Sequence, residues 1–502
     1  MPALPNDRRL AEITISIGAV LASIAFSITH VVLDPLPNPD GVVYLVAAQA
    51  WLDEGYAAAA AIYPLPVYSI LIAWVHAASG LTLLTSAHCL DVALIAGLIV
   101  AMQRLTAALG GGMRVQVIVV VLALLLPELN GYRSFLLRDF AYWTFAVLAL
   151  VFLARHAVEP TLMRAGAFVA MCALAAAFRA EALVLMAAMP LALLSRSVAP
   201  RAFLTLSMCV LAVIVSVVLL YVALASPATT WLSQALHQGI RLASEVPERI
   251  DGQIAGFGTH VLDPRFHDYA AFGMAGGLIT MIAVHIFNAA SLPLTAIAIA
   301  GLLTGSYGRM DRRATPVMVA ALGVAILSLA VVLTARGIIQ TRYAMPAGLL
   351  IVVIAAFAID DWYRRADVRR GGLRWASALL VTYFLGEAGF GLINSKQHYV
   401  DAADWLAQHT TRDARIFSND LRVVYLAGRT VDWRAAGVAL SSDMKTPLGT
   451  YDYWVTNGAR DGAEELVHER GLTQVAQFAN RKGQALLIYS TSSPTAGPGR
   501  AR

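Results

Sequence analysis

Acidic, aromatic and basic side chains gather in four short stretches of this sequence, each beside a long apolar run. The first is Asn38-Pro-Asp-Gly-Val-Val-Tyr44, where Asp40 and Tyr44 share a face if a helix starts at Gly41. A carboxylate placed there could take a proton from a reacting hydroxyl as a general base. The alternative is a Pro-Asp-Gly turn in which Asp40 caps the helix. We predict that Asp40 is catalytic and that Tyr44 binds substrate.

The second stretch is Tyr63-Pro-Leu-Pro-Val-Tyr68, at the start of an apolar run that extends to Gly80. Tyr63 is a candidate for substrate binding. The alternative is an aromatic belt, because Tyr is common at membrane interfaces for purely physical reasons.

The third stretch, residues 127–143, carries the strongest signal. Glu128, Asn130, Arg133, Arg138 and Asp139 lie between two apolar runs, on the side of the membrane where basic residues are disfavoured. Guanidinium groups there suit a phosphate or pyrophosphate, which they bind through paired hydrogen bonds. The alternative is that Glu128 pairs with Arg133, and Arg138 with Asp139, only to neutralise charge. We predict that all five residues bind substrate.

The fourth stretch is Phe178-Arg-Ala-Glu181, together with Gln340-Thr-Arg-Tyr343. Ionisable groups at membrane depth are costly and are often functional. Arg179, Glu181, Arg342 and Tyr343 are therefore further candidates for substrate binding. A structural pair of Arg179 with Glu181, and snorkelling of Arg342 to the interface, are the alternatives.

The histidines and cysteines indicate no metal site. The His residues are scattered without a ligand spacing, and Cys89, Cys172 and Cys209 all lie in apolar stretches. No Gly-rich phosphate loop is present, so the sequence does not support direct use of ATP. We predict no definite cofactor and leave a divalent metal ion open.

The composition is that of an integral membrane protein. Of 502 residues, 58% are hydrophobic and 14% are charged, whereas soluble proteins have about 25% charged residues. This composition excludes disorder and a disulfide scaffold. The formal charge of +5 requires no nucleic-acid partner, because membrane proteins collect basic residues on cytoplasmic loops.

Apolar runs predict about eleven membrane-spanning helices. A crossing at the apolar run 64–80 would put the next arginine-bearing loop outside, so this run is interpreted as a helix in the outer leaflet. The run 271–305 is too long for one crossing and is interpreted as one crossing with an interfacial segment before it. Arginines then fall in alternate loops, which places the N-terminus in the cytoplasm and the C-terminus outside. The runs are 11–33, 84–108, 114–127, 139–155, 162–178, 182–196, 202–226, 285–306, 314–335, 345–361 and 373–393.

The expected organisation follows from these runs. Residues 1–10 form a cytoplasmic N-terminus and 11–395 a transmembrane catalytic domain, with outer loops at 34–83 and 227–270. Residues 396–490 mix polar and apolar positions in the pattern of a small extracytoplasmic α/β domain, with a helix at 401–407 and short strands at 414–418, 423–426, 453–455 and 485–489. The Ser-, Pro- and Gly-rich stretch 491–502 is typical of a disordered tail.

In this order the motifs resemble the glycosyltransferase-C superfamily of polytopic sugar transferases, and within it bacterial relatives of protein O-mannosyltransferases and of aminoarabinose lipid A transferases. The likeness covers residues 10–395 in layout and is concentrated in 38–68, 127–143 and 178–181. The matching motifs are Pro-Asp-Gly-x-x-Tyr, Tyr-Pro-x-Pro, Pro-Glu-Leu-Asn-x-x-Arg, Arg-Asp-Phe-x-Tyr-Trp and Phe-Arg-x-Glu.

The resemblance implies an inverting enzyme of the bacterial cytoplasmic membrane with its active site outside. It would move a sugar from a polyprenyl-phosphate donor to a lipid, glycan or protein acceptor, with Asp40 at the reaction centre. Many relatives have Asp-Glu where this chain has Asp40-Gly41, so a second acid at that position is not carried over. An O-antigen ligase or polymerase that uses a pyrophosphate-linked glycan, and a lipid or polysaccharide transporter, are the alternatives.

Overall fold

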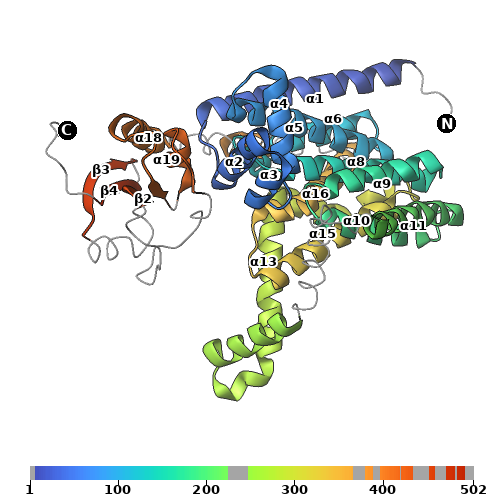
Figure 1. The fold of residues 1–502 in the computed structure, drawn as a ribbon. Coiled ribbons are helices and arrows are strands. Elements are labelled where there is room, and N and C mark those ends of the chain that lie inside the picture. Colours follow the sequence, from blue (N-terminus) through green and yellow to red (C-terminus); the bar gives the residue numbers. More distant parts are fainter. Residues whose placement is uncertain are drawn as a thin grey trace. The chain divides into compact units, whose positions relative to one another are not determined.

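The computed structural model describes residues 6–223, 247–365, 379–387, 396–418, 420–432, 451–457, 471–480 and 483–491. The chain is a largely helical, multi-span membrane protein with a small mixed sheet near its C-terminus (Figure 1). It divides into two compact units. Unit 1 comprises Met1–Phe26, Val92–Tyr132 and Arg138–Ala388, and unit 2 comprises Ser27–Asp91, Arg133–Leu137 and Gly389–Arg502.

Six helical segments among the described residues are long and apolar enough to cross a membrane: Arg9–Leu33, Leu83–Ala108, Asp139–Val158, Pro264–Ala290, Thr315–Ala335 and Thr341–Arg365. They confirm long helices in the predicted runs 11–33, 84–108, 139–155, 314–335 and 345–361. The predicted runs 114–127, 162–178, 182–196 and 202–226 coincide with shorter apolar helices, and of the run 373–393 only the helical residues 379–387 are described.

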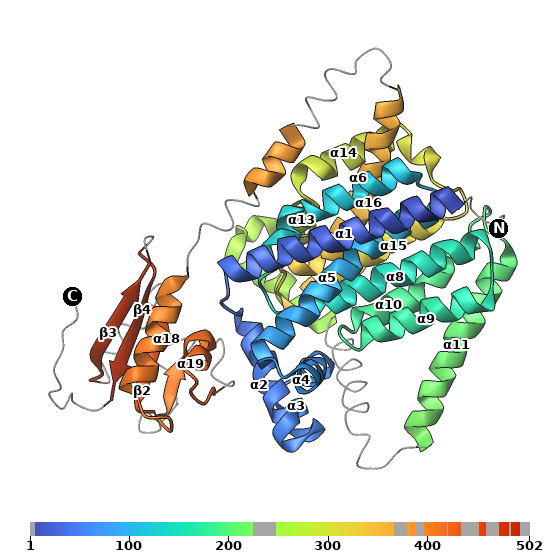
Figure 2. The same cartoon turned by 90° about the horizontal axis from the view of Figure 1, so that it is seen from above.

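Unit 1 is a bundle in which α8, α9, α10, α15 and α16 lie side by side (Figure 2). Local sequence sets the helix ends. Asp139 lies in the first turn of α8 and Arg155 in its last, which suits the helix dipole, and the Thr161 side chain caps α9. The helices are α1 (Asn6–Leu33), α5 (Leu83–Ala108), α6 (Met113–Leu124), α7 (Pro127–Gly131), α8 (Asp139–Val158), α9 (Leu162–Ala176), α10 (Glu181–Ala188), η1 (Met189–Leu194), α11 (Pro200–Ala223), η3 (Pro264–Tyr269), α13 (Ala270–Ala290), α14 (Leu292–Leu303), η4 (Ser306–Arg309), α15 (Thr315–Arg336) and α16 (Thr341–Arg365), with α1 and α5 continuing into unit 2.

The predicted crossing 285–306 is wrong in its bounds. The long helix there is α13, which ends at Ala290, and α14 begins at Leu292. Between them Ser291 has a φ of 66°, and Pro293 then occupies the first turn of α14. A left-handed residue followed by a proline interrupts the backbone ladder, so the apolar run is split into two helices.

The arginine-bearing loops of unit 1 meet one another. Arg104 pairs with Glu12 at 3.1 Å, and the backbone of Asp311 donates to that of Leu109 at 2.9 Å. Arg313 reaches the carbonyl of Val158 at 3.2 Å. The adjacent buried acids at the end of α16 hold four further arginines, with Asp360 between Arg114 and Arg364 and Asp361 between Arg309 and Arg365. Loops far apart in the sequence therefore share one end of the bundle.

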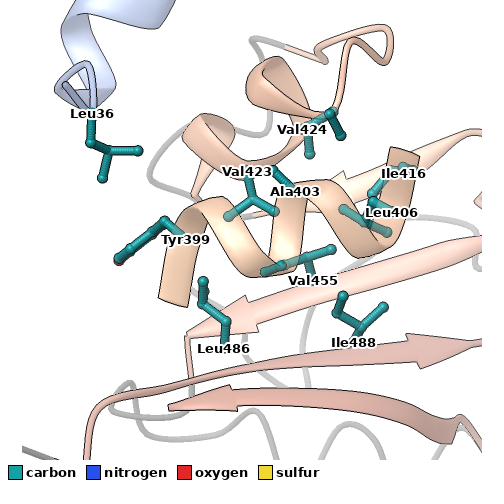
Figure 3. Close-up of a cluster of buried hydrophobic side chains, with 12 residues drawn as sticks. Leu36, Tyr399, Ala403, Leu406, Ile416, Val423, Val424, Val455, Leu486 and Ile488 are labelled. Atoms are coloured by element: carbon teal, nitrogen blue, oxygen red, sulfur yellow. The ribbon is translucent and has the colours of Figure 1, made fainter. Parts of the chain in front are cut away.

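Unit 2 combines the segment after α1 with the C-terminal region. Its helices are α2 (Pro39–Glu54), α3 (Tyr56–Ile62), α4 (Val67–Ser79), α18 (Gln397–His409) and α19 (Leu421–Leu426). Its sheet has the order β1-β2-β4-β3, with β1 parallel to β2 and the other pairs antiparallel; the strands are β1 (Ile416–Ser418), β2 (Tyr453–Asn457), β3 (Thr473–Ala479) and β4 (Ala485–Ser490). Buried apolar side chains join α18 and α19 to this sheet (Figure 3).

The expected helix at 401–407 and the strands near 416, 453 and 485 are confirmed, and β3 was not anticipated. The predicted strand 423–426 is wrong, because these residues form α19. Asp420 caps that helix by accepting from the backbone of Arg422, and the cap overrides the strand preference of Val423 and Val424. Parts of the predicted outer loop 227–270 (residues 227–246) and of the predicted tail 491–502 (residues 492–502) lie outside the described residues.

Candidate functional site

Asp40 lies in the first turn of α2 and is partly exposed. The helix starts at Pro39 rather than at Gly41, and Asn38 takes the N-cap position. Proline suits the first helical position because its missing N–H is not needed there.

Gly41 explains why no second acid follows Asp40. A Cβ atom at Gly41 would lie 2.7 Å from Oδ1 of Asn38 and 2.9 Å from Cβ of Leu136. The same Asn38 oxygen accepts a 2.8 Å hydrogen bond from the backbone N–H of Leu136. The residues of this turn therefore pack directly on the segment Arg133–Leu137, and the close packing requires glycine.

Tyr44 and Tyr63 lie together in unit 2, as part of a cluster with Tyr68. The ring of Tyr44 makes edge contacts to both other rings at centroid distances of 5.1 Å. Tyr68 in turn donates a 2.7 Å hydrogen bond to Asp91, a residue that the sequence patterns did not identify. Its only signal was an acid inside the apolar run of α5.

Asn130 and Arg133 are buried. The Asn130 side chain donates to the carbonyl of Leu124 at 3.0 Å, and Nη1 of Arg133 donates to Oγ of Ser27 at 2.6 Å. Both side chains are about 1% exposed. Their substrate-binding roles stay predictions, and these contacts favour a structural part for both.

Arg179 joins two acids in unit 1. Its Nη1 lies 2.5 Å from Oδ1 of Asp139, and its Nη2 lies 2.5 Å from Oε1 of Glu181. Burial by itself would lower the pKa of Arg179, but the two carboxylates outweigh it and hold that pKa above its ordinary value. The expected pairing of Arg179 with Glu181 is present. Asp139, for which the sequence offered Arg138 as a partner, pairs with Arg179. Arg179 is thus a charge bridge between its two acidic partners.

Arg342 lies beside this bridge. Two guanidinium groups lie over the ring of Tyr343. The guanidinium of Arg179 is 4.6 Å from the ring centroid, and the guanidinium of Arg342 is 5.3 Å from it. Both distances are within the range of a cation–π interaction. Arg138 is close enough to act electrostatically on Glu181. Arg138 and Arg342 are both partly exposed, unlike Arg179.

Glu128 accepts a 2.6 Å hydrogen bond from the hydroxyl of Tyr132. Burial raises the pKa of this carboxyl, and the bond from Tyr132 opposes the shift in part. The charge of Arg342 also acts electrostatically on the hydroxyl of Tyr132. Glu128 therefore belongs to the same polar neighbourhood as Arg342.

Two small cavities adjoin at this charge bridge. The polar one encloses about 20 Å³ and the apolar one about 30 Å³, and both are formed by α8, α10, α15 and α16. Tyr142, Glu181, Ala325, Ser328 and Pro346 line both of them. The polar cavity adds Asp139, Arg179, Arg342 and Tyr343, and the apolar cavity adds leucines, valines, alanines and Trp143. The two cavities are thus neighbours, one with a charged lining and one with an apolar lining, and together we call them the recess.

The described residues do not supply a metal site. No three His, Cys, Asp or Glu side chains among them lie together in a way that could hold a metal ion.

The whole fold is similar to solved structures of membrane glycosyltransferases. One is the archaeal oligosaccharyltransferase AglB from Archaeoglobus fulgidus in complex with an inhibitory peptide and a dolichol-phosphate, with a TM-score of 0.56 and 12% identity over 96% of this chain and 74% of that chain. Another is ArnT from Cupriavidus metallidurans bound to undecaprenyl phosphate, with a TM-score of 0.53 and 11% identity over 97% of this chain and 99% of that chain.

No protein-family model matches the sequence, and no curated protein matches it either. The likeness therefore concerns the fold. This chain is therefore similar in fold to these two membrane enzymes, and that is the fold that the resemblance of its motifs implied.

Proposed function

We propose that this protein is a membrane glycosyltransferase that moves a sugar from a polyprenyl-phosphate donor to an acceptor outside the cytoplasm. The observation that carries this proposal is the recess of unit 1, in which a charged cavity lined by Arg342 and Tyr343 lies next to an apolar cavity. A ligand that fits such a recess has an anionic head and a hydrocarbon tail. Phosphate-linked polyprenols, which occupy two proteins of similar fold, have that chemistry.

Arg342, which lines the charged cavity, and Arg138, which acts electrostatically on the lining residue Glu181, are the proposed groups that hold the phosphate. Arg179 already pairs with two carboxylates, so its positive charge is balanced within the protein. Guanidinium groups bind phosphate oxygens through two parallel hydrogen bonds. Because the two cavities enclose only about 20 and 30 Å³, a prenyl chain has to displace side chains as it enters.

Asp40 is the proposed general base. It would take the proton of the acceptor hydroxyl while the hydroxyl oxygen attacks the anomeric carbon from the face opposite the phosphate. The bond between that carbon and the phosphate oxygen then breaks, and its electron pair leaves with the polyprenyl phosphate. Arginines stabilise the departing anion, and a single in-line displacement inverts the anomeric centre.

The proposed orientation of the chain rests on the arginine-bearing loops. Their meeting at one end of unit 1 supports a common, cytoplasmic location for them under the positive-inside rule. With about eleven crossings in a bacterial cytoplasmic membrane, the N-terminus then faces the cytoplasm, and the active site and the domain 396–490 face outward. That domain would contact the lipid, glycan or protein acceptor.

The test is transfer by the purified protein from a labelled polyprenyl-monophosphate sugar. We expect transfer by the wild type, no transfer by Asp40→Asn, and loss of undecaprenyl-phosphate binding in Arg342→Ala. The exposed Arg265, which pairs with nearby Asp263 and with no other acid in the part of the chain that the structure describes, supplies the control variant Arg265→Ala. Transfer only from a pyrophosphate-linked glycan would favour the ligase or polymerase alternative. Vesicle uptake of the lipid without transfer would favour a transporter.

A further inference from the structure

The segment that leads to Asp40 is unusually stiff. Its sequence is Asp34-Pro-Leu-Pro-Asn-Pro-Asp40, with proline at every second position. Proline fixes its own φ and restricts the preceding residue to extended conformations. Asn38 accordingly has φ −73° and ψ 161°. Residues 34–40, which we call the proline strut, therefore transmit the position of one end to the other.

The strut is anchored in the C-terminal domain by Leu36. This side chain is 3% exposed and belongs to the same buried cluster as Tyr399, Val423 and Leu486 (Figure 3). The cluster otherwise consists of residues from α18, α19, the strands and Ala427. Leu36 thus completes a hydrophobic core that the C-terminal domain would otherwise leave open at this point.

An ion pair fixes the start of the strut. Nζ of Lys396, one of three lysines in the chain, lies 2.6 Å from Oδ2 of Asp34 and 5.6 Å from the ring centroid of Phe135. Ser134 is 3.5 Å from the same Asp34 oxygen. Lys396 directly precedes α18, so the ion pair ties the first helix of the C-terminal domain to the strut.

The far end of the strut is held as well. Asn38 binds the backbone of Leu136, and α2 itself contacts α19. Asp40, two residues after Asn38, lies in the first turn of α2. Contacts with the C-terminal domain and with segment 133–137 therefore bracket the residue that we assign as base.

We propose that the C-terminal domain positions Asp40, through Leu36 and the Asp34–Lys396 pair acting on the proline strut. The catalytic part of this inference rests on the proposed function of Asp40. The domain is then a working part of the active site, and Asp34, Leu36 and Lys396 are positioning residues.

Hydrogen exchange of residues 39–45 in the full-length protein tests the positioning without any assay of activity. Leu36→Ala should speed exchange there about thirtyfold or more, the effect of truncating a buried leucine. Asp34→Lys and Lys396→Asp should each speed it by up to about fivefold, because the pair is partly exposed. The double variant Asp34→Lys/Lys396→Asp should restore wild-type exchange.

Two matched variants test whether the faster exchange comes from losing the buried Leu36 side chain in particular. Leu33 precedes the strut and is 53% exposed, so Leu33→Ala should leave residues 39–45 unchanged, and Leu36→Met should stay close to wild type. Unchanged exchange in Leu36→Ala, or no restoration by the charge swap, would overturn the proposal.

Kinetics supply the second arm. In the transfer assay, the single charge variants should lower kcat, by as much as about a hundredfold for a displacement near 1 Å, with little change in donor KM. The charge swap should restore kcat. If the wild type transfers no sugar, the proposed function fails, and the exchange measurements still decide whether the C-terminal domain orders the turn that carries Asp40.

Discussion

The hydroxyl of Tyr68 donates a 2.7 Å hydrogen bond to Oδ2 of Asp91, and each side chain is only 1% exposed. The same oxygen lies 3.4 Å from the backbone N–H of Leu137, which donates to it. A single buried carboxylate on α5 therefore joins α4 to the segment that packs on Gly41. Tyr68 also contacts Tyr44 edge-on, so the aromatic cluster depends on this carboxylate.

Replacing Asp91 by Ala should destabilise the protein by about 1–3 kcal/mol, because two buried donors lose their acceptor. Asp91→Asn keeps an acceptor oxygen and should cost less. Thermal unfolding in detergent measures the difference, with Asp53→Ala as the control, since Asp53 is exposed and accepts a hydrogen bond from Gln49 of its own helix. A wild-type melting temperature for Asp91→Ala would show that the carboxylate has no such role.

Asp91 also shows what limited the sequence analysis. A lone acid in an apolar run has no local partner, and the residues it binds lie 23 and 46 positions away. The spacing of residues 127–143 likewise predicted a possible pair of neighbours, Arg138 and Asp139, whereas the fold pairs Asp139 with Arg179, 40 positions along. Turn chemistry and long apolar runs were readable because they are local. The pair of Arg179 and Glu181, two positions apart, was readable for the same reason, whereas partners far apart in the sequence were not, because helix packing decides them.

Gly41→Glu should inactivate the protein, although the family it resembles often has Glu at this position. Any Cβ there would meet Asn38 at 2.7 Å and Leu136 at 2.9 Å, and overpacking of this kind costs about 1–3 kcal/mol. Gly41→Ala should already lower both the melting temperature and the transfer rate. Gly131→Ala is the control, because nothing lies within 4 Å of a Cβ at that position. Full stability and full activity of Gly41→Glu would contradict the packing argument.

Arg179 and Arg342 should fail in different ways. Removing Arg179 leaves Asp139, 3% exposed, and Glu181 without their shared cation, and breaking such a buried pair costs about 3–5 kcal/mol. Arg342 is partly exposed, so Arg342→Ala should melt near wild type but lose affinity for undecaprenyl phosphate. Melting curves with and without the lipid separate the two effects. Equal stability of Arg179→Ala and Arg342→Ala would refute the assignment of Arg179 as a structural bridge.

The C-terminal domain should lose stability as the pH falls through about 6.5. His398, the second residue of α18, is 6% exposed, and Nδ1 of its ring has no hydrogen-bond partner among the described residues. Burial lowers the pKa of His398, and the charge of Arg422 lowers it further, while Asp401 and Asp420 oppose the shift. Because the unfolded chain binds the proton more readily, stability is greatest above the ordinary pKa of 6.5 and declines below it.

Exchange of the α18 amides at about pH 7.5 and pH 5.5, corrected for intrinsic rates, measures this loss. His398→Phe keeps an aromatic ring that cannot titrate, so it should remove much of the decline between the two pH values. His409 lies at the exposed end of the same helix, and His409→Phe should leave the decline intact. Equal declines in the wild type and His398→Phe would mean that other groups govern the acid sensitivity of this domain. If only variants that keep His398 lose stability at low pH, the packing around Leu36 should loosen as well. The reason is that α18 supplies part of the core in which Leu36 is buried. The positioning of Asp40 would then weaken together with the domain as the medium becomes acidic.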